Sequence, residues 1–129
     1  MKPLIAIVDD NEDNRLLMRA MLEDRFEIAE YENGPSALDG LSRIMPDVVL
    51  LDISLPGMDG TQVLARMRAD ARLGGLPVIA LTAHAMAGDR EKYLAAGFDG
   101  YLAKPIVDEQ AVVDAIRDVL TSRSGAPAA

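Results

Sequence analysis

The chain alternates apolar, strand-like runs with amphipathic, helix-like runs five times, and no other feature limits its fold as strongly. The strand-like runs cover residues 4–8, 27–31, 48–51, 78–81 and 99–103. A helix-like run follows each of them, with predicted starts near residues 12, 35, 61, 88 and 108. This alternation favours an α/β fold in which one parallel sheet is covered by helices on both faces. The 129 residues suffice for one such domain.

The polarity of the runs predicts the order of the strands. The first, third and fourth runs are apolar almost throughout, as expected of strands buried on both faces. The second run contains Glu27 and Glu30 and the fifth contains Asp99, so both belong at the edges. Right-handed crossovers then favour a five-stranded sheet of order 2-1-3-4-5. Winding reverses between strands one and three, and ligands of open α/β sheets bind at the carboxyl ends beside such a reversal.

Reactive side chains follow the strand-like runs at those carboxyl ends. Asp9 and Asp10 come after the first run, and Asp52 comes after the third. Thr82 follows the fourth run, and Lys104 follows the fifth. Because parallel strands end on one edge of the sheet, we expect three carboxylates, a hydroxyl and an ammonium to share one crevice.

The composition excludes several classes of function. The net charge of −8 disfavours direct binding to nucleic acid, and the lack of cysteine excludes thiolate metal sites. No apolar run approaches the roughly 20 residues of a membrane span, and a strand begins too early to leave room for a signal peptide. We therefore expect a cytoplasmic protein without membrane association, with a domain over residues 1–121 and a flexible tail over 122–129.

Three carboxylates in one crevice repel one another unless a cation offsets their charge. Two unit charges about 4 Å apart repel by about 4 kcal/mol at an effective dielectric near 20. The candidate ligands are oxygens, apart from the nitrogens of His84, which favours Mg²⁺ over zinc. We expect Asp10 and Asp52 to contact Mg²⁺ directly, together with a backbone carbonyl near Ser54, and Asp9 to act through water.

An aspartate beside Mg²⁺ can also act as a nucleophile and form an aspartyl-phosphate. Asp52 is the best placed, because its strand lies between the other two strand ends. The transferring phosphoryl group carries negative charge on three equatorial oxygens. Mg²⁺ can stabilise one oxygen and the Lys104 ammonium a second. The Thr82 hydroxyl and nearby backbone N–H groups can stabilise the third.

These residues stand in five ordered pieces: Asp9-Asp10-Asn11, Asp52, Leu55-Pro56-Gly57-Met58-Asp59-Gly60, Leu81-Thr82-Ala83, and Tyr101 before Lys104-Pro105. In this pattern the chain resembles a response-regulator receiver domain, over about residues 4–120. The resemblance implies a CheY-like, flavodoxin-like fold with the strand order given above. It also implies phosphoryl transfer to Asp52 from a histidine kinase or a histidine phosphotransfer protein in a two-component or phosphorelay pathway.

The resemblance further assigns roles to individual residues. Asp9 and Asp10 would hold Mg²⁺ with Asp52, and Lys104, Thr82 and the Ala83 backbone would bind the phosphate.

A second set of residues would carry the response. Thr82 would move toward the phosphate and Tyr101 would turn inward, so that the fourth helix, fifth strand and fifth helix dock a downstream protein. Pro105 would follow a cis peptide bond, and Ser54 and His84 would tune the lifetime of the phosphate.

Each residue also has an ordinary structural interpretation. Asp9 and Asp10 could cap the first helix, although Asn11 is available for that role. Lys104 could be a solvated loop lysine, and Tyr101 could be a static aromatic of an edge strand. Only the combination at the strand ends favours the functional interpretation.

Two other functions remain open from the residues alone. A Mg²⁺-dependent phosphatase of the haloacid-dehalogenase type also uses a strand-end aspartate, but it needs a second aspartate where this chain has Ser54. A receiver module of a hybrid histidine kinase is the other alternative, suggested by the run at residues 80–86. We expect a signalling phosphoacceptor and no steady catalytic turnover.

The first helix is the predicted dock for the phosphodonor. The residues expected to pack against the sheet are Leu16, Leu17, Ala20 and Met21. The residues expected to point outward, beside the crevice, are Asn14, Arg15 and Met18.

Overall fold

The computed structural model describes residues 2–83, 88–104, 106 and 108–124. The strands are β1 (Leu4–Val8), β2 (Glu27–Tyr31), β3 (Val48–Asp52), β4 (Val78–Thr82) and β5 (Gly100–Ala103). The helices are α1 (Glu12–Leu22), α2 (Gly34–Ile44), α3 (Gly60–Ala69), α4 (Asp89–Ala96) and α5 (Glu109–Ser124). Among the described residues, no helix combines the length and the apolar character needed to cross a bilayer.

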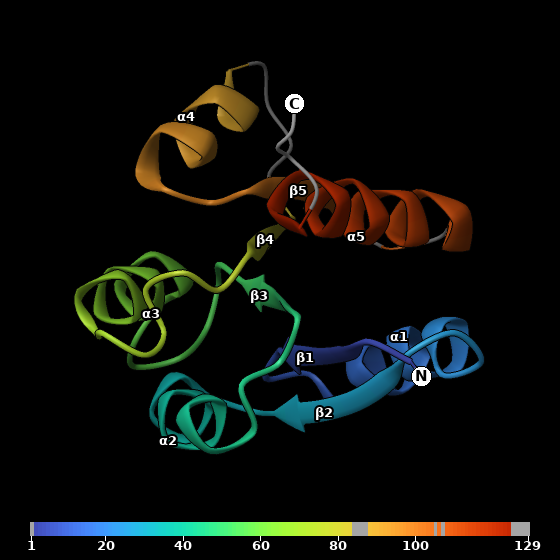
Figure 1. The fold of residues 1–129 in the computed structure, drawn as a ribbon, viewed down its shortest axis with the longest axis horizontal. Helices are drawn as coiled ribbons and strands as arrows, with labels where there is room; N and C mark the ends of the chain where they lie inside the picture. Colours follow the sequence, from blue (N-terminus) through green and yellow to red (C-terminus); the bar gives the residue numbers. More distant parts are fainter. Residues whose placement is uncertain (1, 84–87, 105, 107, 125–129) are drawn as a thin grey trace.

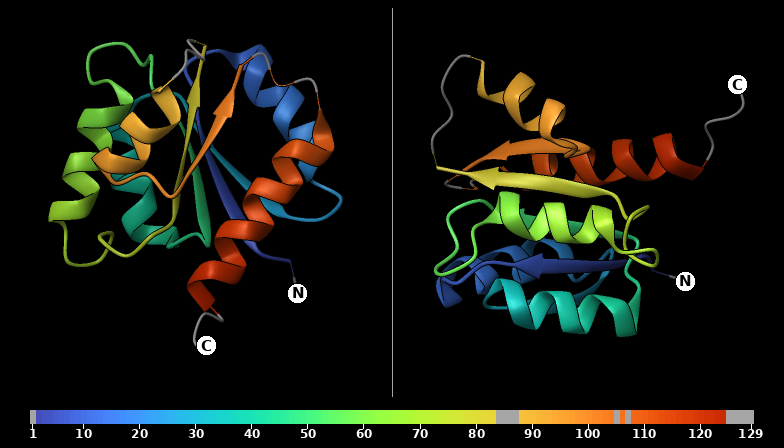
Figure 2. Two further views of the ribbon diagram at one scale, coloured as in Figure 1. Left: turned by 90° about the horizontal axis from the view of Figure 1, so that it is seen from above. Right: turned by 90° about the vertical axis from the view of Figure 1, so that its left-hand side faces the viewer.

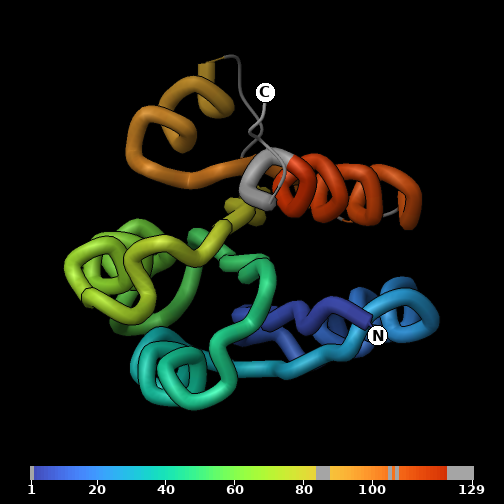
Figure 3. Tube along the Cα trace, in the orientation of Figure 1, coloured from blue at the N-terminus to red at the C-terminus, as the bar shows by residue number. Residues whose placement is uncertain are grey.

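All five strands are parallel and form one sheet in the order β2-β1-β3-β4-β5, which confirms the predicted topology. Helices α1 and α5 cover one face of the sheet, and α2, α3 and α4 cover the other (Figures 1 and 2). The course of the chain shows β1 between β2 and β3, where the winding reverses (Figure 3). The carboxyl ends of the strands therefore share one edge.

Two apolar layers hold the sheet between the helices, because successive side chains of a strand point to opposite faces. Buried strand residues facing α1 and α5 are Ile5, Ile7, Val48, Leu50, Ile79 and Leu81. Those facing the other three helices are Ala6, Val8, Val49, Leu51, Val78 and Ala80. Strands β3 and β4 are buried throughout, whereas β2 and β5 are partly exposed, as their polarity predicted.

Side chains at the starts of the helices leave the aspartates after β1 free for other roles. The Asn11 side chain accepts a hydrogen bond from the Asn14 N–H at 3.1 Å and so caps α1. Asp59 caps α3 in a reciprocal box with Gln62, and Asp108 accepts from the Gln110 N–H at the start of α5. Because Asn11 fills the cap of α1, the capping interpretation of Asp9 and Asp10 is not needed.

The predicted inner face of α1 is correct for Met21, which packs against the core, and wrong for Leu16, Leu17 and Ala20. Leu16 is 55% exposed and Leu17 is 43% exposed, while Met18 and Leu22 are buried. Residues 16–22 are apolar on most sides of the helix, so the sequence did not determine which stripe meets the core. The structure uses Met18, with Met21 and Leu22 three and four residues later. Met18 therefore cannot be a docking residue, and Leu16 and Leu17 lie in solvent.

The ends of two helices differ from the expected bounds. Helix α1 ends at Leu22, whereas the amphipathic pattern of the sequence predicts a helix to about Asp24. Helix α5 continues to Ser124 and so enters the segment expected to be a tail.

Candidate functional site

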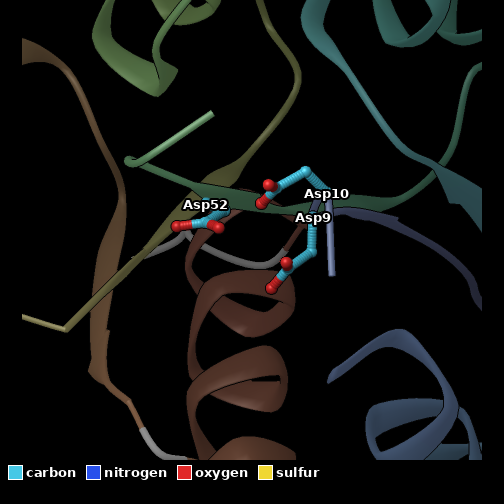
Figure 4. Close-up of side chains that lie close together, drawn as sticks. All are labelled: Asp9, Asp10 and Asp52. Carbon is cyan, nitrogen blue, oxygen red and sulfur yellow. The ribbon is translucent and has the colours of Figure 1, made fainter. Parts of the chain in front are cut away.

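Three carboxylates meet at the carboxyl ends of β1 and β3. Asp9 directly follows β1, Asp10 comes next, and Asp52 is the last residue of β3. Asp9 and Asp52 are buried and Asp10 is exposed. One oxygen from each residue lies within 4.8 Å of the others, and the side chains gather around a shared space (Figure 4). The structure thus brings together the acidic residues that the sequence placed in one crevice.

Lys104 joins the two buried carboxylates. Its Nζ donates to Asp9 Oδ2 at 3.2 Å and to Asp52 Oδ2 at 3.1 Å. The Lys104 backbone N–H donates to the Thr82 carbonyl at 2.8 Å, which extends the pairing of β4 and β5 by one residue. This bond holds the lysine at the strand edge, so that its side chain, 16% exposed, reaches across to β1 and β3.

The negative charges of the site exceed the positive charge that the described residues place there. Burial raises the pKa of Asp52, and the nearby charge of Asp9 adds to the increase, although hydrogen bonds from the Ser54 N–H and Lys104 oppose it. Burial alone would lower the pKa of Lys104, but its hydrogen bond to Asp52 and the charges of Asp52 and Asp9 outweigh burial and raise it. Among the described residues, one ammonium thus lies beside three carboxylates, a surplus of negative charge that suits a cation.

Backbone contacts fix the position of Asp52. Its Oδ1 accepts a hydrogen bond from the Ser54 N–H at 3.0 Å, and the Ile53 N–H donates to the Leu81 carbonyl at 2.9 Å. The Gly60 N–H donates to the Ile53 carbonyl at 2.9 Å, where α3 begins. A Cβ on Gly60 would lie 2.5 Å from the Asp52 carbonyl oxygen, so α3 can start this close to the site only at a glycine.

Every polar group of Asp9 has a partner. The Asp9 N–H donates to the Tyr31 carbonyl at 3.1 Å, and Oδ1 accepts from the Asn11 N–H at 2.9 Å. Asn14 Nδ2 lies 3.4 Å from Oδ2, and Arg15 Nη1 donates to the Asp9 carbonyl at 2.6 Å. The sequence interpretation placed Asn14 and Arg15 outward, but both turn toward Asp9. Their position in the first turns of a helix capped by Asn11 was the signal that could have revealed them.

The remaining predicted residues lie around this cluster. Thr82, the last residue of β4, is buried, and Ala83 follows it in an exposed position. Tyr101 of β5 is partly buried, and its ring stacks on Tyr93 of α4 with centroids 5.9 Å apart. Ser54 is exposed beside Asp52. The predictions for His84 and Pro105 fall outside the described residues.

Residues 5–117 match the family model of the response regulator receiver domain. The chain belongs to this family. A receiver domain is a signalling module and not a classical enzyme, so the family favours signalling over the alternative phosphatase, whose second aspartate is replaced here by Ser54.

Relatives and solved structures agree with the family. The chain is 41% identical over 112 residues to the sensor protein GacS of Pseudomonas syringae pv. syringae, with 84% of this chain and 12% of GacS covered. It is 40% identical over 107 residues to the polar-differentiation response regulator DivK of Brucella anthropi, with 82% and 87% covered. The receiver domain of the sensor histidine kinase PA1611 from Pseudomonas aeruginosa PAO1 superposes with a TM-score of 0.84 at 32% identity, covering 95% of this chain and 100% of that domain. That domain carries a magnesium ion in its active-site cleft.

The donor set of this chain fits the same kind of ion. Its acidic cluster offers carboxylate oxygens alone, two of them from buried residues, and such oxygen ligands select hard cations. The residues present are therefore compatible with Mg²⁺.

Proposed function

We propose that Asp52 accepts a phosphoryl group from a phosphohistidine of a histidine kinase or a histidine phosphotransfer protein. The supporting observation is the buried Asp52 carboxylate, which lies beside Lys104 and two further aspartates. A bond forms between an Asp52 oxygen and phosphorus while the phosphorus–nitrogen bond of the donor breaks. The imidazole leaves with the electron pair of that bond and takes a proton from solvent, so charge and atoms balance.

The carboxylates of Asp9, Asp10 and Asp52, with the backbone carbonyl of Ser54, would hold Mg²⁺ at this edge of the sheet. The ion would supply positive charge to the transferring phosphoryl oxygens. Asp9 keeps Lys104 in the site through the bond at 3.2 Å, and the Ser54 N–H keeps Asp52 oriented. These residues prepare the carboxylate for attack before a donor arrives.

The phosphate-binding groups come from β4 and the residue after β5. Lys104 would move from its bridge between the carboxylates to pair with the new phosphate, which carries more charge than the carboxylate it now contacts. The Thr82 hydroxyl and the Ala83 N–H would bind the other phosphate oxygens, because both lie at the carboxyl end of β4, the strand adjacent to β3. Exposed Ser54 would influence how readily water reaches the phosphate.

The signal would leave through the surface of α4, β5 and α5. Tyr101 lies on β5 and packs against Tyr93 of α4, so a shift of Thr82 and Tyr101 would be felt by α4. A downstream protein would bind this surface in the phosphorylated state. To change from mostly inactive to mostly active, the active state must favour the phosphate by about 5 kcal/mol.

The phosphodonor would dock on α1, where the exposed side chains differ from the predicted ones. Leu16 and Leu17 are large apolar residues in solvent, and Leu17 lines a small cavity with Asp9 and Lys104. An apolar face that adjoins Asp9 and Lys104, the residue that pairs with the acceptor, suits a protein surface that presents its histidine toward Asp52. Leu16→Glu is expected to slow transfer from a phosphotransfer protein but not from acetyl phosphate, which needs no docking.

The two relatives suggest two kinds of protein in which the domain could occur. GacS and DivK differ in how much of their length the chain covers, 12% and 87%. The same acceptor chemistry would serve a single-domain regulator and a receiver module of a hybrid kinase.

Incubation with acetyl phosphate and Mg²⁺, followed by intact mass measurement, tests the proposal. The wild type is expected to gain one phosphoryl group, and Asp52→Asn is expected to gain none. Asp59→Asn is the matched control, because Asp59 is an exposed carboxylate that caps α3 seven residues away. Equal labelling of wild type and Asp52→Asn, or full labelling of the wild type in excess chelator, would contradict the proposal.

A further inference from the structure

Arg15 connects the acidic site to the edge strand β2. Its Nη1 donates to the Asp9 carbonyl at 2.6 Å, and its Nε donates to Glu30 Oε1 at 3.1 Å. The Arg15 side chain is only 14% exposed. Glu30 Oε2 in turn accepts from Arg19 Nε at 2.6 Å, so each oxygen of Glu30 holds one arginine. Arg15 is therefore fixed at one end by Glu30 and reaches Asp9 with the other.

The carbonyl that Arg15 binds belongs to the peptide between Asp9 and Asp10. Because a peptide unit is planar, holding its oxygen sets the orientation of the whole unit and hence the direction from which the Asp10 side chain leaves the backbone. Asp10 needs such support, because its exposed carboxylate accepts no hydrogen bond from the rest of the described chain. By contrast, the Asp9 carboxylate is held by Asn11 and Lys104.

We propose that Arg15, held by Glu30, is a positioning residue that orients the Asp9–Asp10 peptide and thereby sets the affinity of the acidic site for a divalent cation. The inference rests on the proposed Mg²⁺ site. Groups that orient metal ligands without touching the metal change its affinity by about 10- to 100-fold when they are removed. Arginine suits this role, because its rigid planar fork can hold a carboxylate and a carbonyl at once, which the lysine ammonium cannot do in the same geometry.

Arg19 provides an internal comparison. It lies on the same helix, one turn further on, and pairs with the same glutamate. Its Nη2 lies 3.5 Å from the Ile28 carbonyl of β2, and it makes no contact with Asp9. The two arginines thus share their charge and their ion pair, and only Arg15 reaches the acidic site. A general effect of charge or of packing of α1 on β2 would act through both.

The experiment compares Arg15→Lys with Arg19→Lys in the full chain. Titration of each protein with MgCl₂ alone, followed by isothermal calorimetry, measures the dissociation constant for Mg²⁺ without any phosphodonor. Arg15→Lys is expected to bind Mg²⁺ about tenfold more weakly than the wild type. Arg19→Lys is expected to stay within about twofold of the wild type, because it leaves the Asp9 carbonyl contact intact. Both variants keep the net charge.

Amide resonances of the metal-free proteins give a second readout. The resonances of Asp10 and Asn11 are expected to shift in Arg15→Lys and to stay in place in Arg19→Lys. Unchanged Mg²⁺ affinity in Arg15→Lys, or an equal loss in both variants, would overturn the positioning role. A wild type that binds no Mg²⁺ would instead overturn the proposed metal site, so the two failures can be told apart.

Discussion

The two ends of the sheet use aspartates in opposite ways. At the amino ends of the strands, Asp99 precedes β5 and its Oδ2 accepts from the Val78 N–H at 2.9 Å and from Arg68 Nη2 at 3.0 Å. Arg68 also donates to the carbonyls of Gly74, Leu76 and Gly97. At the carboxyl ends, Lys104 pairs with Asp9 and Asp52, and a carboxylate oxygen of Asp10 lies within 4.8 Å of theirs.

The difference between the ends separates structural from functional charge. Around Arg68, the guanidinium pairs with the Asp99 carboxylate and donates to three backbone carbonyls. Asp47, which precedes β3, likewise holds a backbone group, since its Oδ2 accepts from the Leu4 N–H at 2.7 Å. Around Lys104, acidic groups outnumber the cation, and burial raises the pKa of Asp52. Such a surplus of like charge costs stability, as expected if this end of the sheet binds the proposed Mg²⁺.

Removing Lys104 is expected to have the largest effect on stability. Lys104→Ala leaves Asp9 and Asp52 buried without a cation, and we expect the free energy of unfolding of the metal-free protein to fall by about 3 kcal/mol. Mg²⁺ is expected to restore part of this loss. Urea unfolding with and without Mg²⁺ measures both. Lys92→Ala, at an exposed lysine of α4, is the control and should cost less than about 1 kcal/mol. An equal loss of unfolding free energy in Lys104→Ala and Lys92→Ala would contradict a special role for the charge of Lys104.

Removing Arg68 tests the amino-terminal end of the sheet, where the charges are expected to contribute to stability alone. Arg68→Ala removes the ion pair with Asp99 and the Arg68 hydrogen bonds to three carbonyls, so we expect a loss of about 2 kcal/mol in unfolding free energy. The Mg²⁺ affinity and the labelling of Asp52 are expected to remain as in the wild type. A clear change in the Mg²⁺ affinity of Arg68→Ala would show that the two ends are not independent.

The smallest predicted effect on stability concerns Asp59, whose carboxylate caps the start of α3. Its hydrogen bonds from the Thr61 hydroxyl and the Gln62 N–H lower its pKa below the usual 3.8. The stability from the ionised cap is therefore present above pH 3.8 and is lost as the pH falls through the lowered pKa. Asp59→Ala is expected to cost about 0.5–1 kcal/mol at neutral pH.

The free energy of unfolding of the wild type and of Asp59→Ala, measured from neutral to strongly acidic pH, tests this pH dependence. The difference between the two proteins should shrink as the pH falls below 3.8. A difference that is the same at neutral and strongly acidic pH would show that ionisation of Asp59 contributes nothing to the cap.

Much of the fold could be predicted from the sequence, because the signals were local and strong. Continuous apolar runs identified the central strands, the glutamates of β2 identified an edge, and polar residues directly after the strands located the site. The inner face of α1 could not be predicted, because the helix carries apolar residues on several sides. Only packing against α5 and the sheet selects Met18 and Leu22.

Contacts between polar residues that lie far apart in the chain could not be predicted from the sequence either. In the sequence, Glu30 indicates only that its strand lies at an edge of the sheet. In the structure it also pairs with Arg15 and so holds this arginine beside Asp9. The pairing of Arg68 with Asp99 joins residues 31 positions apart, and nothing in either local pattern indicates it. Such pairs depend on the final arrangement of the elements and not on the propensity of any one of them.

The dependence of stability on Mg²⁺ tests the central claim most directly, namely that the acidic cluster is built for a divalent cation. The unfolding free energy of the wild type is expected to rise by about 1.4 kcal/mol for each tenfold increase in Mg²⁺ beyond the dissociation constant. Asp52→Asn is expected to be more stable than the wild type without metal, since it removes a buried charge, and to gain less from Mg²⁺. A wild type whose unfolding is indifferent to millimolar Mg²⁺, together with a less stable Asp52→Asn, would contradict the claim.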